Sequence, residues 1–157
     1  MAISGILNKF FGSKSQRDIK EVLPLLNKIR EAYEVIKRLS NDELRAKTTE
    51  IKNYVRNSVN ELEKHIQDMK QQVESDNLDV EKMEDLYREI DKTEKEIVAE
   101  IEKALLEILP NAFSIVKETA RRFAENEYIE VTATDMDKDI ASQRNSVEIH
   151  GDKARYM

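Results

Sequence analysis

Three aspartates at alternate positions are the residues of this chain that most resemble a metal site. Asp135, Asp137 and Asp139 match the start of a calcium-binding loop, in which alternate side-chain oxygens coordinate the ion. That loop needs glycine at its sixth position and glutamate at its twelfth, whereas this sequence has Ile140 and Ser146. Both departures remove what the calcium geometry requires, so we expect no calcium site and no other metal site.

The other residue types that commonly carry chemistry are few and widely spaced. The two histidines, His65 and His150, offer no local ligand pair, and we interpret the first as a surface residue and the second as structural. The absence of cysteine excludes disulfides, iron–sulfur clusters and cysteine-ligated zinc. Gly5, Gly12 and Gly151 lie too far apart to form a phosphate-binding loop. We therefore expect no catalytic residues and no bound cofactor in this stretch.

The composition indicates long helices rather than a β-rich domain. The chain has 157 residues, of which 37% are charged, against about 25% in an ordinary domain. Three glycines and two prolines are too few for the many turns of a sandwich or barrel. The length favours one domain, with or without an appendage. No apolar run is long enough for a transmembrane helix, and no secretory signal is visible.

The charge is distributed unevenly along the chain. Residues 1–53 carry a net charge of +4, residues 54–109 a net charge of −8 and residues 110–157 a net charge of −2. Phosphate binding needs clustered lysine and arginine, so the acidic middle argues against a nucleic-acid partner. The basic front could instead meet an anionic surface.

The first residues form the candidate contact site. Five apolar side chains recur with helical spacing, and three cations lie on or just beyond that helix, so the segment could lie in a bilayer interface. It could equally pack on another protein or on its own core. The candidate contact residues are Ile3, Ile6, Leu7, Lys9, Phe10, Phe11, Lys14 and Arg17.

A second helix is expected at about 18–39, with a kink or restart near Val22–Pro24 because proline breaks a helix interior. A capping box at Ser40 and Glu43 predicts the next helix start. The predicted buried stripe of the 18–39 helix consists of Ile19, Val22, Leu23, Leu26, Ile29, Tyr33 and Ile36.

An apolar seam then continues from Leu44 to Val73, and a second seam runs from Val80 to Ile108. Two such helices joined by a short polar turn predict an antiparallel helical hairpin. The pattern fits a plain structural arm and an arm for a partner equally well.

Pro110 is expected to begin one further helix. Beyond Asn126 the pattern predicts a strand at 128–133 and a short helical turn that Asp135 caps and that runs through Ile140. It also predicts a β-hairpin at 147–156 turning at Gly151–Asp152. The predicted fold is therefore mainly α with a small C-terminal β-hairpin, and the chain looks cut after that hairpin. The expected core face of the helix after Pro110 consists of Ala112, Phe113, Val116, Ala120 and Phe123.

Three segments resemble the SecA family, the ATPase motors of the bacterial preprotein translocase. The segment K-R-L-S-N-D-E-L-R-A-K-T at 37–48 is similar to a family stretch of the form LS(D/N)EEL..KT. The segment L-P-N-A-F-S-I-V-K-E-T-A-R-R at 109–122 resembles the family helix LPEAFA.VREA..R. The segment I-L-N-K-F-F-G-S-K-S-Q-R-D at 6–18 resembles the family's opening. The three segments occur in the same order as in the family, so the resemblance extends over residues 1–124.

The resemblance implies an N-terminal piece of a SecA motor rather than the motor itself. The charged hairpin at about 55–105 and the segment from Glu125 onward look like insertions of Bacteroidetes-type members. The adenine-reading motif FDVQL and the phosphate loop GEGKT of the family do not occur in this sequence. The chain would thus lead into a RecA-like α/β motor domain that is itself absent, and ATP and Mg would be bound only by the full-length protein.

The resemblance also implies partners and a location. The family's N-terminal segment contacts acidic lipid, the SecY channel and a second copy of the protein, and it corresponds here to residues 3–17. Preprotein would bind domains outside this chain. The implied location is cytoplasmic, peripheral at the inner face of the cell membrane.

These observations divide the chain into five expected segments. They are an amphipathic N-terminal helix (1–17), N-terminal helices (18–54), a helical-hairpin insertion (55–108), a helix supporting the nucleotide-binding domain (109–124) and short strands of an incomplete domain edge (125–157). The alternative is a free-standing helical interaction module that binds through the arm. A stop codon after Met157 in the parent reading frame would favour the module, and continuation into a phosphate loop would favour the motor.

Overall fold

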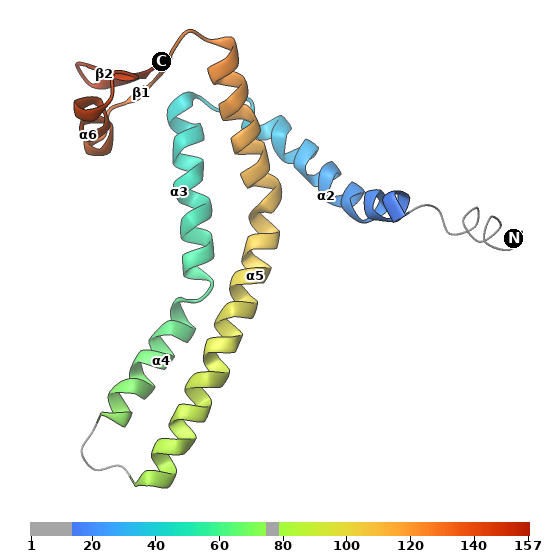
Figure 1. The fold of residues 1–157 in the computed structure, drawn as a ribbon, viewed down its shortest axis with the longest axis vertical. Coiled ribbons are helices and arrows are strands. Elements are labelled where there is room, and N and C mark those ends of the chain that lie inside the picture. The colour runs from blue at the N-terminus through green and yellow to red at the C-terminus, as the bar shows by residue number, and fades with distance from the viewer. Residues whose placement is uncertain (1–13, 75–78) are drawn as a thin grey trace, which may run out of the picture. The chain divides into compact units, whose positions relative to one another are not determined.

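The computed structural model describes residues 14–74 and 79–157, with side chains described from residue 18 onward (Figure 1). Over these residues the mainly α fold class is confirmed. The described residues form two compact units. One unit consists of the chain up to Leu44 together with Pro110–Met157, and the other consists of Arg45–Leu109. The helices are α2 (Lys14–Ile36), α3 (Asn41–Asn57), α4 (Asn60–Val73), α5 (Val80–Glu125) and α6 (Asp135–Gln143), and the strands are β1 (Ile129–Thr132), β2 (Val147–His150) and β3 (Lys153–Tyr156).

Helix α2 continues through Pro24, so the expected restart near Val22–Pro24 is wrong. A proline inside a helix removes one backbone donor, here the partner of the Lys20 carbonyl. Lys20 and Pro24 are both exposed, so water can take the place of that donor. The cost of the proline is therefore small enough for the helix to persist.

Helix α3 begins where the capping box predicts. The Ser40 hydroxyl accepts from the Glu43 backbone N–H at 3.2 Å, and the Glu43 carboxylate accepts from the Ser40 N–H at 2.7 Å. These two bonds satisfy backbone donors that a helix start leaves without partners. The hydrogen bond from the Ser40 N–H also lowers the pKa of Glu43.

The single helix expected over the first seam is interrupted at Ser58–Val59, between α3 and α4. The Ser58 hydroxyl donates to the Val55 carbonyl at 2.8 Å, a local bond that competes with regular helix geometry. Val59 is nevertheless buried. The apolar seam is therefore still buried at the point where the helix is interrupted.

Side chains of the two seams form the core of the Arg45–Leu109 unit. Ile66 and Met69 of α4 pack with Ile90 of α5, and Leu86 and Ile97 pack against this cluster. Figure 1 shows α4 alongside the adjoining part of α5. The predicted helical hairpin is thus present in the described residues.

The second seam departs from the prediction by about one residue in places. Tyr87 and Leu105, which helical spacing assigns to the predicted seam, are exposed, whereas their neighbours Leu86 and Ala104 face inward. A helix with 3.6 residues per turn drifts against a 3.5-residue repeat, so the buried stripe shifts by about one position over several turns. Thr93 is also buried, and its hydroxyl donates to the Glu89 carbonyl at 2.9 Å.

Helix α5 runs through Pro110, so the new helix expected at that residue is wrong. The proline deprives the Leu106 carbonyl of its helical donor, but Leu106 is exposed, so water can replace it. The Ser114 hydroxyl lies 2.8 Å from the Pro110 carbonyl oxygen and 3.0 Å from that of Ile29. Ser114 thereby joins α5 to α2.

The strands pair in the order β1–β3–β2, all antiparallel. The predicted hairpin between β2 and β3 is confirmed, with Gly151 and Asp152 as its two-residue turn. The addition of β1 to the other edge of β3 was not foreseen, because periodicity identifies a strand but not its partner.

Helix α6 differs from the expected turn at both ends. Thr134 precedes it as the N-cap residue, where Asp135 was expected, and the helix extends to Gln143 rather than Ile140. The buried Asp137 carboxylate accepts from the Thr134 N–H and hydroxyl, both at 2.7 Å. The Tyr156 hydroxyl also donates to Asp137. This aspartate of the calcium-like motif therefore caps the start of α6 and binds Tyr156 of β3.

Replacing Gly151 with alanine should destabilise the hairpin by about 1 kcal/mol. Gly151 has φ +62°, and nothing lies within 4 Å of a β-carbon added there, so the cost arises from the backbone alone. Asparagine tolerates this region better, so Gly151→Asn should cost less. Hydrogen exchange of the hairpin amides measures both. Equal protection in all three proteins would contradict this explanation of the turn.

Candidate functional site

The predicted contact residues from Ile3 to Phe11 lie outside the described residues. Lys14 and Arg17 fall in the first turns of α2, where the backbone is described but the side chains are not. The contact prediction for these positions therefore stays a prediction.

The stripe predicted on α2 is buried only in its C-terminal half. Ile36 is fully covered, and Ile29 and Tyr33 are partly buried. The expectation is wrong for the N-terminal half, because the helix pattern identifies an apolar face without saying what covers it. The exposed members of the stripe are Ile19, Val22, Leu23 and Leu26.

The expected core face at the C-terminal end of α5 is wrong for most of its residues. Phe113, Val116 and Phe123 are 54%, 67% and 46% exposed, Ala120 is exposed and Ala112 is partly buried. The opposite face of the helix is buried instead. We call the exposed side chains of Phe113, Val116, Ala120 and Phe123 the α5 apolar face.

The buried side of α5 carries a charged cluster centred on Glu118, whose side chain is completely covered. The Arg121 guanidinium donates to both carboxylate oxygens, at 2.9 and 2.6 Å. Arg122 Nε donates to Oε1 at 2.7 Å, and the Tyr33 hydroxyl donates to Oε2 at 3.0 Å. The Lys117 ammonium lies 4.0 Å from the centre of the Tyr33 ring. The cluster therefore ties α5 to α2.

The electrostatics of the cluster favour the charged form of Glu118. The hydrogen bonds from Arg121 lower its pKa to about 2, and those from Arg122 and Tyr33 act in the same direction. Burial opposes this shift but is the smaller effect. Burial, together with the bond to Glu118, raises the pKa of Tyr33. These shifts fit a structural ion pair that is stable over the physiological pH range.

The Glu118 cluster was not predicted from the sequence. Glu118 stands three and four residues before Arg121 and Arg122, the spacing at which opposite charges meet on one helix face. That signal was available, but the neighbouring phenylalanines suggested that the opposite face was buried. The spacing also gives no indication that Tyr33, which is 85 positions away in the sequence, joins the cluster.

His65 is a surface residue as expected, whereas the structural role expected for His150 stays a prediction. His65 is exposed on α4. His150 lies at the end of β2, 2.9 Å from the Glu148 carboxylate. Among residues 14–74 and 79–157, no helix combines the length and apolar character needed to cross a membrane. No group of three potential metal-ligating side chains gathers within the same ranges.

Comparison with known proteins reveals similarity along nearly the whole chain. The family described as "SecA DEAD-like domain" matches residues 7–135. "Protein translocase subunit SecA" of Bacteroides fragilis is 48% identical over 157 residues, which is 100% of this chain and 14% of that protein. The same subunit of Porphyromonas gingivalis is 46% identical over 157 residues, and that of Flavobacterium psychrophilum is 42% identical over 97% of this chain. Each alignment covers 14% of the relative, and no solved structure matches.

Proposed function

This chain belongs to the SecA family, and on that premise we propose that it is the docking and support region of an ATP-driven preprotein translocase. It corresponds to the N-terminal region of SecA and spans about 14% of the length of the curated relatives it matches. The family match favours this function over the free-standing interaction module. Nothing further supports the alternative, in which the helical hairpin at 55–108 is a binding surface for a partner.

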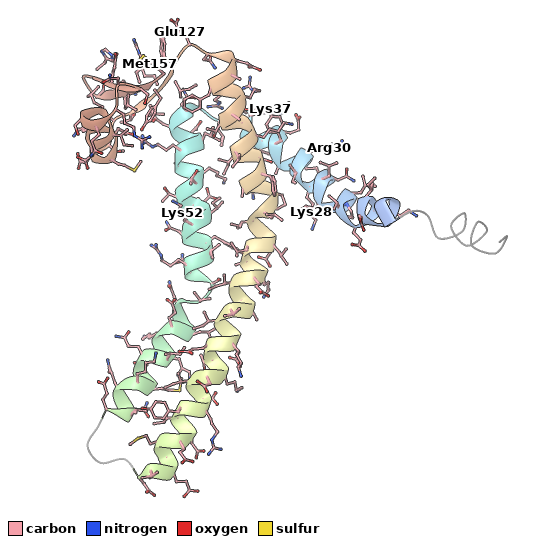
Figure 2. All side chains as sticks on the ribbon, in the orientation of Figure 1. Lys28, Arg30, Lys37, Lys52, Glu127 and Met157 are labelled. Carbon is pink, nitrogen blue, oxygen red and sulfur yellow. The ribbon has the colours of Figure 1, made fainter. Side chains whose placement is uncertain are left out.

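The observation that carries the docking proposal is the exposed apolar face of α2, which follows the predicted contact residues 3–17 in the sequence and would bind the membrane together with them. It has the i, i+3, i+4, i+7 spacing of the predicted face at 3–11, and α2 begins only a few residues later. Arg30 follows Leu26 by four residues and so lies on the same side of the helix, whereas Lys28 projects from another side (Figure 2). An apolar helix face with nearby cations can bind a lipid interface through both contributions. The exposed residues are Ile19, Val22, Leu23 and Leu26.

The proposed partners are anionic lipid and the SecY channel, with the protein peripheral at the cytoplasmic face of the membrane. A second copy of the protein is a further partner through residues 3–17. Preprotein would bind regions of the longer protein that this chain does not include.

The residues of this chain do not fit an ATP or Mg site. A phosphate loop needs closely spaced glycines, whereas the three glycines here are scattered and Gly151 forms the hairpin turn. ATP and Mg would therefore be held elsewhere in the full-length motor. We expect purified 1–157 to show no ATPase activity.

The support role is proposed for the α5 apolar face. Contiguous apolar side chains on one side of a helix indicate a surface that another part of the protein covers. The relatives are about seven times longer than this chain, so most of such a protein lies outside it. We propose that the nucleotide-binding domain packs on this face. The segments 1–17, 18–54, 55–108, 109–124 and 125–157 remain our proposed division of these roles.

Vesicle co-sedimentation of 1–157 and of a form lacking residues 1–17 tests the docking proposal. We expect 1–157 to bind vesicles containing anionic lipid, and binding to weaken with salt as charges are screened. The truncated form should bind at least tenfold more weakly, because it lacks several large apolar side chains and three cations.

Vesicles of neutral lipid serve as the matched control, since they retain the apolar interface but remove the surface charge. Equal sedimentation of both forms with anionic vesicles would exclude residues 1–17 as the docking element. Hydrolysis of ATP by the highly purified chain would contradict the division between docking region and motor.

A further inference from the structure

Strand β1 forms one edge of the sheet, and its outer edge is occupied by the first turn of α3. Edge strands present backbone groups that invite pairing with another strand, and proteins cover them in various ways. Here the Asn41 Nδ2 group donates to the Glu130 carbonyl at 3.0 Å. The Thr132 N–H donates to Asp42 Oδ1 at 2.7 Å, and the Thr132 hydroxyl donates to Oδ2 at 2.8 Å.

These bonds use the side of β1 that faces away from β3. Glu130 and Thr132 are two residues apart, so their backbone groups point to the same side of the strand. The intervening Val131 pairs with Ala154 of β3 and is buried. The side chains of α3 thus take the positions that a fourth strand would otherwise occupy.

The orientation of the Asn41 amide is set by Arg122. Arg122 Nη1 donates to Asn41 Oδ1 at 2.7 Å, which turns Nδ2 toward the Glu130 carbonyl. Arg122 Nη2 donates to the Leu39 carbonyl at 2.5 Å, and Nε binds Glu118. Because a guanidinium has only donors, it can bind only the oxygen of the amide. Arg122 therefore connects the Glu118 cluster to the edge of the sheet.

The four residues Ser40–Glu43 consequently have two functions in one helical turn. The outer pair, Ser40 and Glu43, caps α3, and the inner pair, Asn41 and Asp42, binds β1. Within the described part of the chain, the extensive backbone contacts of the strands are with one another and with α6. The bonds from Asn41 and Asp42 thus attach β1 to the start of α3.

We propose that Asn41 and Asp42 form a latch on the outer edge of β1, positioned by Arg122. Opening this latch frees β1 from α3 while the strand ladder and α6 remain folded. The latch also blocks addition of a further strand at this edge.

Amide hydrogen exchange of 1–157 followed by NMR tests the latch. In Asp42→Ala the Thr132 amide should exchange at least tenfold faster, because it loses a hydrogen bond to a charged acceptor. The amides that join β2 to β3 should change less than threefold. Asp42→Asn keeps one oxygen for the Thr132 N–H and should give intermediate exchange. This milder variant also keeps the test decisive if Asp42→Ala fails to fold.

Asp135→Ala is the matched control, since Asp135 is also an acidic residue in a first helical turn but pairs with Lys138 instead of a strand. It should leave the Thr132 amide unchanged. Unchanged Thr132 exchange in Asp42→Ala would overturn the latch. Equal acceleration of every strand amide would also overturn it, because the bonds would then be inseparable from the sheet as a whole.

Arg122→Lys tests the positioning role. Lysine keeps the positive charge but cannot bind Glu118, Asn41 and the Leu39 carbonyl at once. The Asn41 side-chain NH₂ signals should shift and exchange at least tenfold faster, as expected when the amide is no longer held in one orientation. Unshifted NH₂ signals would show that Arg122 does not orient Asn41.

Discussion

Glu118→Gln should lower the free energy of unfolding of the unit that contains it by about 3 kcal/mol at neutral pH. Glutamine keeps the shape of the side chain but removes the charge that three donor side chains share. The Arg122 side chain is only 11% exposed, so the variant leaves a mostly buried guanidinium without its counter-charge. Urea denaturation followed by tyrosine fluorescence or NMR measures the loss.

Glu125→Gln is the matched control for this prediction. Glu125 also pairs with Arg121, but its side chain is 56% exposed, and exposed ion pairs contribute at most about 1 kcal/mol. Similar losses in the two variants would show that burial of Glu118 does not determine its contribution.

The same cluster predicts how stability depends on pH. The pKa of Glu118 is about 2 in the folded protein and 4.5 ordinarily, so the unfolded chain binds the proton more readily. The contribution of Glu118 is therefore complete above pH 4.5 and declines as the pH falls toward 2. Between pH 4.5 and 2 the free energy of unfolding should fall more steeply with decreasing pH in the wild type than in Glu118→Gln. Identical pH profiles would contradict the assignment.

Phe113→Ala should behave differently in the short chain and in the full-length protein. In 1–157 the ring is 54% exposed, so its loss should change stability by less than about 1 kcal/mol. If the nucleotide-binding domain covers the α5 apolar face, the same change in the full-length protein should cost about 3 kcal/mol. Thermal or urea unfolding of both lengths provides the comparison.

Tyr87→Ala controls for the loss of an exposed ring on the same helix, in the other compact unit. It should be nearly neutral at both lengths. A small effect of Phe113→Ala in the full-length protein would remove the support role from the α5 apolar face.

Local signals in the sequence predicted local structure well. The Ser40–Glu43 capping box, the helical hairpin and the turn at Gly151 each depend on residues close in sequence, and each is present. The breaks expected at Pro24 and Pro110 did not occur, because exposed carbonyls on the preceding turn can bind water instead.

The features that could not be predicted depend on distant residues. Amphipathicity identified the apolar faces of α2 and α5, but not whether another element covers them. The capping motif revealed Ser40 and Glu43, whereas the bonds from Asn41 and Asp42 to β1 span about 90 positions. Tyr33 and Arg122 likewise depend on partners more than 80 positions away. Spacing along one helix cannot reveal such pairs.

The most direct measurement compares the full-length protein with a form lacking residues 1–17, recording binding to anionic vesicles and ATPase activity without vesicles. A region that docks but does not hydrolyse ATP predicts at least tenfold weaker vesicle binding with unchanged ATPase activity. Undiminished vesicle binding, or ATPase activity that falls in parallel with binding, would contradict the proposed division of roles.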